Sequence, residues 1–119
     1  MPELPEDELL RYVGRDLVDR DGKQIGYVDT IFNDDETGQP EWIGVLAGVF
    51  RQHKHLVPAS TVEPANGALR VPFSKRWVTH APTYDREDRS GMLGLGSYRL
   101  AISKEKEREA YAYYDGLGR

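Results

Sequence analysis

The sequence predicts a mostly β domain with a short helix near each end. Short runs of β-branched and aromatic residues alternate with turn residues over residues 15–72. One of these turns contains Asp21-Gly22 between two such runs, which is the pattern of a β-hairpin. Apolar residues at helical spacing appear mainly ahead of Gly14 and after Ser103. A chain of 119 residues suits one domain of this kind.

The composition fits a globular domain and excludes several kinds of chemistry. Hydrophobic residues make up 39% of the chain and charged residues 30%. The sequence contains no cysteine, which excludes a disulfide scaffold, a cysteine-based zinc site, an iron–sulfur cluster and a thiol nucleophile. Its longest apolar run, residues 43–50, is too short to cross a membrane. The first eight residues are acidic and lack the basic region of an export signal, so we expect a cytoplasmic protein.

The N-terminal segment, residues 1–13, predicts a short helix. Pro5 suits a helix start, and the acidic residues 6–8 that follow favour the positive end of the helix dipole. Gly14 marks the end of the helix. The apolar stripe of this helix is formed by Leu9, Leu10 and Val13.

The Asp-Gly hairpin joins a strand at residues 17–18 to a strand at residues 25–32. The alternation of apolar and polar residues is broken in the second strand, where apolar residues recur at every third position. Gly26 lies between the first two of these apolar residues. Because a glycine inside a strand marks a bulge or a sharp bend, we expect the second strand to bend at Gly26.

The third strand, residues 41–49, is apolar almost throughout. Such a run indicates that both of its faces are covered, either by a barrel interior and a helix or by a second subunit. The elements expected after it are short strands at residues 55–58, 62 and 68–72, one helical turn at 74–80, a linker at 81–97 and a helix at 104–115. Ser74 and Ser103 are suited to cap the two helical segments.

Five short motifs follow one another along residues 13–82, at residues 14–22, 25–28, 57–58, 69–71 and 81–82. In this order and spacing they resemble the PRC-barrel family. The resemblance implies a small, strongly bent antiparallel β-barrel of about six strands that serves as a docking surface rather than as a catalyst. The positions that carry the family pattern are Gly14, Asp21, Gly22, Ile25, Gly26, Val28, Val57, Pro58 and Pro82.

The resemblance also implies a division of the chain and a choice of relatives. The segments expected are an N-terminal helical segment at residues 1–13, a PRC-barrel domain at 14–82, a linker at 83–102 and a C-terminal helix at 103–116. Residues 40–42, Gly48 and the acidic, tyrosine-rich last helix resemble stand-alone bacterial members, which are linked loosely to stress. Two other branches are the cytoplasmic domain of the photosynthetic reaction-centre H subunit and the C-terminal domain of the ribosome maturation factor. Their membrane helix and N-terminal barrel are not recognised in this sequence, so we expect neither role to transfer by position alone.

The net charge of −4 is distributed unevenly. Residues 1–41 carry −8, residues 42–80 carry +4 and residues 81–119 are balanced. An acidic chain is a poor non-specific nucleic-acid binder, and segments of opposite sign can meet within the fold or across a self-association contact. The basic segment also contains Phe73 and Trp77, which leaves RNA contact as an alternative to simple burial of these rings in the core.

Three motifs resemble metal or cofactor sites but lack essential parts. His53 and His55 lie on one face of an extended segment, but a zinc or nickel site needs a third and usually a fourth ligand. Residues 34–36 lack the alternate acids and central glycine of a calcium loop, and the glycines of residues 91–96 lack a dinucleotide or P-loop pattern. We therefore expect a solvated turn and a linker at these places, and no catalytic residue, metal or cofactor.

The third strand and the last helix are the expected protein-binding surface. The residues assigned to it are Trp42, Ile43, Val45, Leu46, Val49, Phe50, Tyr111 and Tyr114. A small chain with this much exposed apolar strand tends to self-associate, so we expect a homodimer, with simple burial within one chain as the alternative. The expected function is a non-enzymatic docking module that binds itself or another protein. The alternative functions are a ribosome- or RNA-associated assembly factor and, by family analogy alone, a reaction-centre accessory protein.

Overall fold

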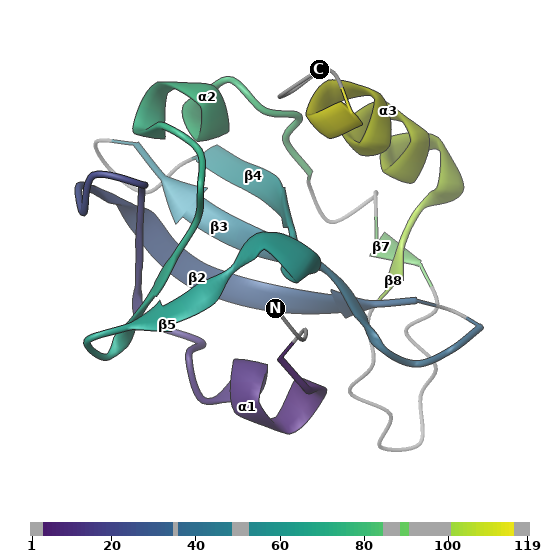
Figure 1. Ribbon diagram of the computed structural model, residues 1–119. Coiled ribbons are helices and arrows are strands. Elements are labelled where there is room, and N and C mark those ends of the chain that lie inside the picture. Colours follow the sequence, from purple (N-terminus) through teal and green to yellow (C-terminus); the bar gives the residue numbers. More distant parts are fainter. Residues whose placement is uncertain (1–3, 35, 49–52, 85–88, 91–100, 116–119) are drawn as a thin grey trace.

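The computed structural model describes residues 4–34, 36–48, 53–84, 89–90 and 101–115. Its main feature is one six-stranded sheet with short helices around it (Figure 1). The strands of this sheet are β1 (Asp16–Val18), β2 (Gln24–Asn33), β3 (Pro40–Ala47), β4 (His53–Pro58), β5 (Glu63–Ala65) and β6 (Ala68–Arg70). The helices are α1 (Glu6–Leu10), the 3-10 turn η1 (Ala59–Thr61), α2 (Lys75–Thr79) and α3 (Lys104–Asp115). The mostly β class predicted from the sequence is confirmed.

The helices lie on two sides of the sheet. In Figure 1, α1 lies below the sheet, and α2 and α3 lie above it. A separate two-stranded ladder, formed by β7 (Arg89–Ser90) and β8 (Ala101–Ile102), leads into α3. The predicted linker therefore contains a short strand, while its residues 85–88 and 91–97 lie outside the described part of the chain. Among the described helices, none has the length and apolar character that crossing a membrane requires.

The sheet is not closed into a barrel, which differs from the expected architecture. Its strand order is β4-β3-β2-β1-β6-β5, so β4 and β5 stand at opposite ends. Residues 82–84 run along the outer edge of β4: the Leu56 N–H donates to Pro82 O at 3.1 Å, and the Tyr84 N–H donates to Lys54 O at 3.0 Å. Because these groups are already paired, β4 has little capacity left there for a closing strand.

The expectation of a wholly antiparallel sheet is also wrong for one pair of strands. β1 pairs with β6 in parallel, with Leu17 opposite Leu69 and Val18 opposite Arg70. β1 lies between β2 and β6 in the sheet. It pairs with β2 in antiparallel orientation, and β6 forms an antiparallel hairpin with β5. The hairpin brings β6 back in the direction of β1, so this junction joins two antiparallel halves through one parallel contact.

The bend predicted at Gly26 is confirmed. Leu17 lies opposite Gly26 and Val18 lies opposite Gln24, so Ile25 is the extra residue of a bulge next to the glycine. A side chain at position 26 has no room, because its Cβ would come within 2.9 Å of the carbonyl carbon of Leu46 and closer still to the oxygen. The glycine thus permits a backbone approach between β2 and β3 that no other residue allows.

Asp19 fixes the hairpin turn to helix α2, a role that the sequence analysis missed. The side chain is buried, and its Oδ1 accepts the N–H groups of Asp21 at 2.8 Å and Lys23 at 2.9 Å. Its Oδ2 accepts the N–H of Lys75, the first residue of α2, at 3.1 Å. Burial opposes the charge of Asp19, but these three hydrogen bonds outweigh it and hold the pKa of the carboxyl below its usual value. The carboxylate therefore connects two segments that are 56 residues apart.

Replacing Asp19 with alanine is expected to lower the free energy of unfolding by about 2–3 kcal/mol, because three N–H groups lose their acceptor. The stabilisation from the carboxylate is present above its ordinary pKa of 3.8 and is lost as the pH falls further. Urea denaturation at pH 7 measures the change. Asp21→Ala is the matched control, since the Asp21 side chain is 63% exposed and its ion pair with Arg20 spans 3.9 Å. Equal losses in the two variants would contradict the role of Asp19.

Candidate functional site

Strand β3, the predicted interface strand, lies inside the molecule. The side chains of Trp42, Ile43 and Val45 are at most 1% exposed, so both faces of the strand are covered, as the apolar run predicts. Leu46 is half-buried, and Tyr111 is 43% exposed. Tyr114 is buried, and Val49 and Phe50 lie outside the described residues. Burial within one chain, the alternative interpretation, therefore accounts for the apolar centre of β3.

The cover over Trp42 comes from the tyrosine face of α3. The Trp42 ring lies 4.8 Å from the Tyr111 ring and 6.2 Å from the Tyr114 ring, measured between centroids. Tyr114 also packs on Phe73, with 5.2 Å between the centroids. These tilted arrangements fall in the distance range that aromatic pairs favour. The C-terminal helix is thus part of the core rather than an appendage.

Three tyrosine hydroxyls of α3 bind three different parts of the domain. Tyr114 Oη donates to the Leu56 carbonyl of β4 at 2.6 Å. Tyr113 Oη donates to the Trp77 carbonyl of α2 at 2.8 Å. Tyr111 Oη donates to the Glu41 carboxyl of β3, as described below. Burial raises the pKa of each of these three phenols, so they stay neutral donors over the physiological range.

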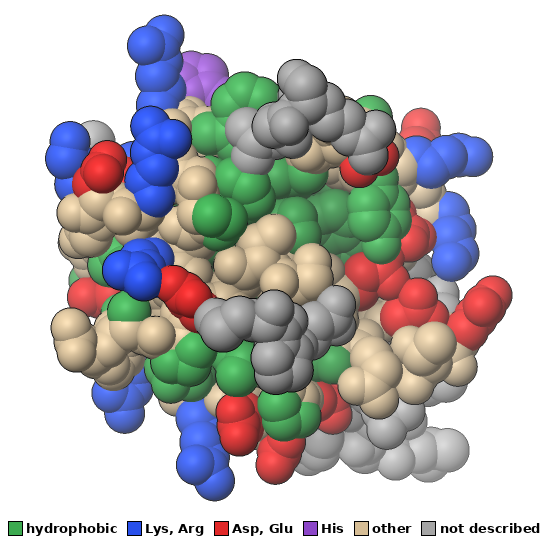
Figure 2. Space-filling view, viewed as in Figure 1, with side chains coloured by type: hydrophobic (Ala, Val, Ile, Leu, Met, Phe, Trp, Pro, Cys, Tyr) green, Lys and Arg blue, Asp and Glu red, His purple; other side chains and the backbone are tan. Residues whose placement is uncertain are grey.

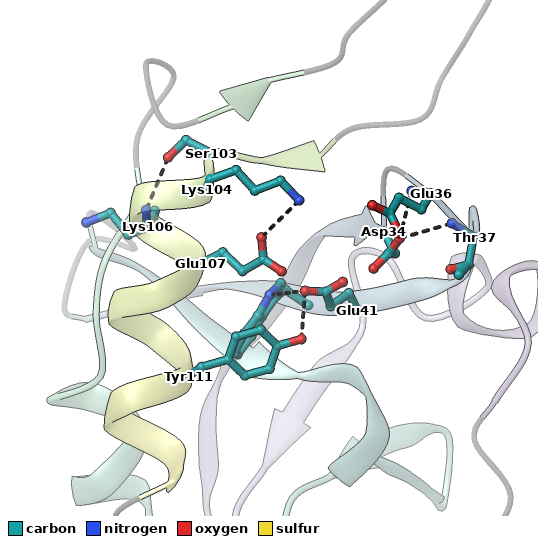
Figure 3. Close-up of polar contacts among 10 residues, drawn as sticks. Asp34, Glu36, Thr37, Glu41, Ser103, Lys104, Lys106, Glu107 and Tyr111 are labelled. Carbon is teal, nitrogen blue, oxygen red and sulfur yellow. Dashed lines mark hydrogen bonds and ion pairs between the residues drawn. The ribbon is translucent and has the colours of Figure 1, made fainter.

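A cluster of three carboxyl groups lies where the turn after β2, strand β3 and helix α3 meet (Figure 3). Glu41 of β3 shares one small space with Asp34 of the turn and Glu107 of α3. Glu41 Oε1 also accepts hydrogen bonds from Tyr111 Oη at 2.7 Å and from Trp42 Nε1 at 3.2 Å. The sequence analysis had treated Asp34 as a turn residue and had given Glu41 and Glu107 no role, because nothing local relates residues so far apart.

Glu41 is the carboxyl of this cluster whose pKa is raised. Carboxyl groups around one small space repel one another when all are ionised, which raises the pKa of a member of the cluster. Burial, together with the contacts to Glu107 and Asp34, raises the pKa of Glu41 to about 7, against the opposing effect of the Tyr111 hydroxyl. The Lys104 ammonium lies 3.6 Å from Glu107 Oε2, so Glu107 has an ion-pair partner within its own helix. A carboxyl in this state can exchange a proton near neutral pH.

The space beside the cluster is too small for a substrate or a cofactor. Its volume is about 10 Å³, which holds one water molecule. The residues that line it are Asn33, Asp34, Glu41, Trp42, Ile102, Lys104 and Glu107. Asp34 is itself engaged in its turn, where Oδ1 accepts the N–H groups of Glu36 at 2.7 Å and Thr37 at 3.0 Å. The solvated-turn interpretation of this acidic segment fits these contacts.

The histidines occupy separate positions. His55 is buried, and its Nδ1 lies 2.9 Å from the Ala81 carbonyl, which as an acceptor requires an N–H at that nitrogen. Burial lowers the pKa of His55, so the ring is held neutral. His53 is exposed, with its ring centroid 6.3 Å from that of His55. In the described part of the chain, no group of three or more His, Cys, Asp or Glu residues has a metal-binding arrangement. The absence of a metal in the working protein stays a prediction.

The rings that suggested an RNA surface are committed to packing. Phe73 is 8% exposed and packs on Tyr114. Trp77 is half-buried and stacks on Tyr113, with 4.6 Å between the centroids. Stacking with a nucleobase requires an accessible ring face, so Phe73 offers no such platform. The core interpretation of these two rings is the one that the packing supports.

These features define a small β-sheet domain whose last helix closes the core, with a half-buried carboxyl group of raised pKa and no substrate-sized space beside it. The family pattern occupies its turns and bends: Gly14 and Gly22 have φ values of +87° and +84°, and Pro82 lies on the edge of β4. The sequence model of the PRC-barrel domain family matches residues 7–78. The chain therefore belongs to the PRC-barrel domain family, as its motifs predict. Among curated proteins, none matches this chain.

Proposed function

We propose that this chain is a non-catalytic docking module of the PRC-barrel type and that it associates with a second copy of itself. The observation that carries the proposal is an apolar pair on α1 and the turn after it. Leu10 is 53% exposed and Val13 is 42% exposed, whereas Leu9, the residue before Leu10, is fully buried. Large apolar side chains exposed side by side favour a protein contact.

The chain also has a groove of complementary character. This groove, of about 430 Å³, is open to solvent at the ends of β2 and β3. Apolar atoms of Ile25 and Leu46 line it, together with Tyr27, and Lys75 stands at its rim from α2. Leu46 is one of the residues that the sequence analysis assigned to the interface. The exposed apolar pair Leu10 and Val13, which follows acidic residues of α1, fits a groove of this composition.

The charges around the two surfaces support the pairing. The residues ahead of the apolar pair on α1 are Glu6, Asp7 and Glu8. The groove has Lys75 at its rim, and Arg76 follows it on α2. In Figure 2, Lys and Arg side chains are more frequent on the left of the molecule and Asp and Glu side chains on its right and lower edges, with some of each kind on the other side. Opposite charges on different parts of one surface favour association of two copies.

Replacing Leu10 with glutamate is expected to prevent self-association, because it puts a charge at the centre of the apolar contact. Sedimentation equilibrium at about 50 µM measures the mass, with a Kd in the micromolar range for the unmodified chain. That chain should sediment at twice 13.5 kDa, and the variant at 13.5 kDa. Ser60→Glu adds the same charge at an exposed position of η1 and should still dimerise.

Three outcomes of this measurement contradict the proposal. A monomeric unmodified chain excludes self-association at that concentration. A dimeric Leu10→Glu variant excludes α1 as the contact. A chain that sediments with nucleic acid, shown by its absorbance ratio and released by high salt, favours the RNA-associated alternative instead.

A further inference from the structure

Helix α3 is held by three tyrosine hydroxyls, and only one of them depends on a group that titrates. The acceptors of Tyr113 and Tyr114 are backbone carbonyls, which keep their character at every pH. The acceptor of Tyr111 is the Glu41 carboxyl, which lines the same small space as Glu107 of that helix. The Tyr111 hydroxyl can donate to Glu41 in either protonation state, but the interaction between Glu41 and Glu107 becomes repulsive when both are ionised.

The groups that face Glu41 are mostly acidic. Asp34 faces it from the turn after β2, and Glu107, Tyr111 and Lys104 face it from α3. On the side of α1, Glu6 accepts a hydrogen bond from Asn33, the neighbour of Asp34. The neighbouring β8 contributes Ile102, which carries no charge. The Lys104 side chain is 71% exposed, so solvent screens its charge.

We propose that a proton on Glu41 holds α3 against the sheet and that loss of this proton loosens the helix as the pH rises. With Glu41 ionised, carboxylates from three elements line one small space, and Glu41 repels Glu107 where β3 meets α3. Movement of α3 relieves this repulsion and brings the carboxylate into water. The same movement uncovers the ring of Trp42, which Tyr111 and Tyr114 cover in the closed state.

The direction of the effect follows from the protonation state. The pKa of Glu41 is about 7 in the docked state, against 4.5 for an ordinary glutamate. A raised carboxyl pKa means that the docked state binds more protons than the released state. The contribution to docking is therefore fully present below pH 4.5, decreases above it and is lost as the pH rises through about 7. We expect the structural change to be confined to α3, because β3 is the one described strand of the sheet that contributes a carboxyl group to this cluster.

Amide hydrogen exchange of the intact chain, at pH 5 and pH 8 and corrected for the intrinsic rates, tests the proposal. The protection of the α3 amides relative to the β2 amides should fall by about tenfold between these two pH values, after allowance for solvent screening. In Glu41→Gln, which keeps the shape and the acceptor for Tyr111 without the charge, the relative protection should stay constant. Glu36→Gln removes an exposed acid from the neighbouring turn and should keep the tenfold fall.

Constant relative protection in the unmodified chain overturns the proposal, and so does an unchanged tenfold fall in Glu41→Gln. If Glu41→Gln does not fold, Glu107→Gln takes its place, because it removes the repelling charge from the helix side. A less than threefold fall in the relative protection of α3 in that variant supports the proposed role of the Glu41 proton, and a full tenfold fall overturns it. A loss of protection that is equal in α3 and β2 indicates global unfolding and also overturns it.

Discussion

Alanine at position 26 is expected to lower the free energy of unfolding by about 3 kcal/mol or more. The added Cβ would meet the Leu46 carbonyl carbon at 2.9 Å and the Ala47 Cα at 3.1 Å. Both are backbone atoms of β3, so no side chain can move aside to relieve the clash. The strands β2 and β3 must separate, and their ladder is the longest in the sheet.

The control for this variant is Gly22→Ala in the hairpin turn. A Cβ at Gly22 meets nothing within 4 Å, but the residue has a φ of +84°. Alanine there should lower the free energy of unfolding by only about 1–2 kcal/mol, the expense of a left-handed backbone. Urea denaturation followed by far-ultraviolet circular dichroism compares the two variants. A Gly26→Ala protein as stable as Gly22→Ala would show that β2 and β3 do not approach as closely as described.

Replacing Trp42 with alanine is expected to lower the free energy of unfolding by about 3–5 kcal/mol. The ring is 1% exposed, lies between Tyr111 and Tyr114, and donates its N–H to Glu41. Its removal leaves a cavity at the seam where α3 meets β3, and it removes the aromatic surface on which the helix packs. The protection of the α3 amides from hydrogen exchange should fall more than that of the β1–β2 hairpin.

The second tryptophan provides the control for this prediction. Trp77 is half-buried and packs on Tyr113, so Trp77→Ala removes a ring of the same size from a less enclosed place. Its loss of unfolding free energy should be about half that of Trp42→Ala. Thermal and urea denaturation followed by circular dichroism suit both variants, because the fluorescence of the chain changes in each. Equal losses would contradict the central place of Trp42.

Features with local causes could be predicted from the sequence. The hairpin follows from Asp21-Gly22, because only glycine adopts the required positive φ without strain. The bulge follows from Gly26, and the start of α2 follows from Ser74, whose Oγ accepts the Trp77 N–H at 3.1 Å. The last helix begins after Ser103, whose Oγ accepts the Lys106 N–H at 3.3 Å. Each signal acts over a few residues, so it is present in the sequence itself.

No local sequence signal of this kind marks the candidate site. Its three carboxyl groups, Asp34, Glu41 and Glu107, belong to three elements, and a pair 66 positions apart is brought together only by the docking of α3. The shift of the Glu41 pKa arises from burial and from these neighbours, neither of which belongs to the residue alone. The exposed pair Leu10 and Val13 was likewise assigned to the inner stripe of a helix, although only Leu9 of that stripe is buried.

The sequence by itself determined the class of fold, the positions of the turns and helix starts, and the family, because these depend on backbone preferences that each short segment carries. The apolar run of β3 also determined that both of its faces are covered. Which element covers them, a helix of the same chain rather than a second subunit, was decided by the tertiary structure, since an apolar residue is buried equally well by either. The open sheet and its parallel β1–β6 contact were decided there too, because the edge of β4 accepts whichever segment the chain path brings to it.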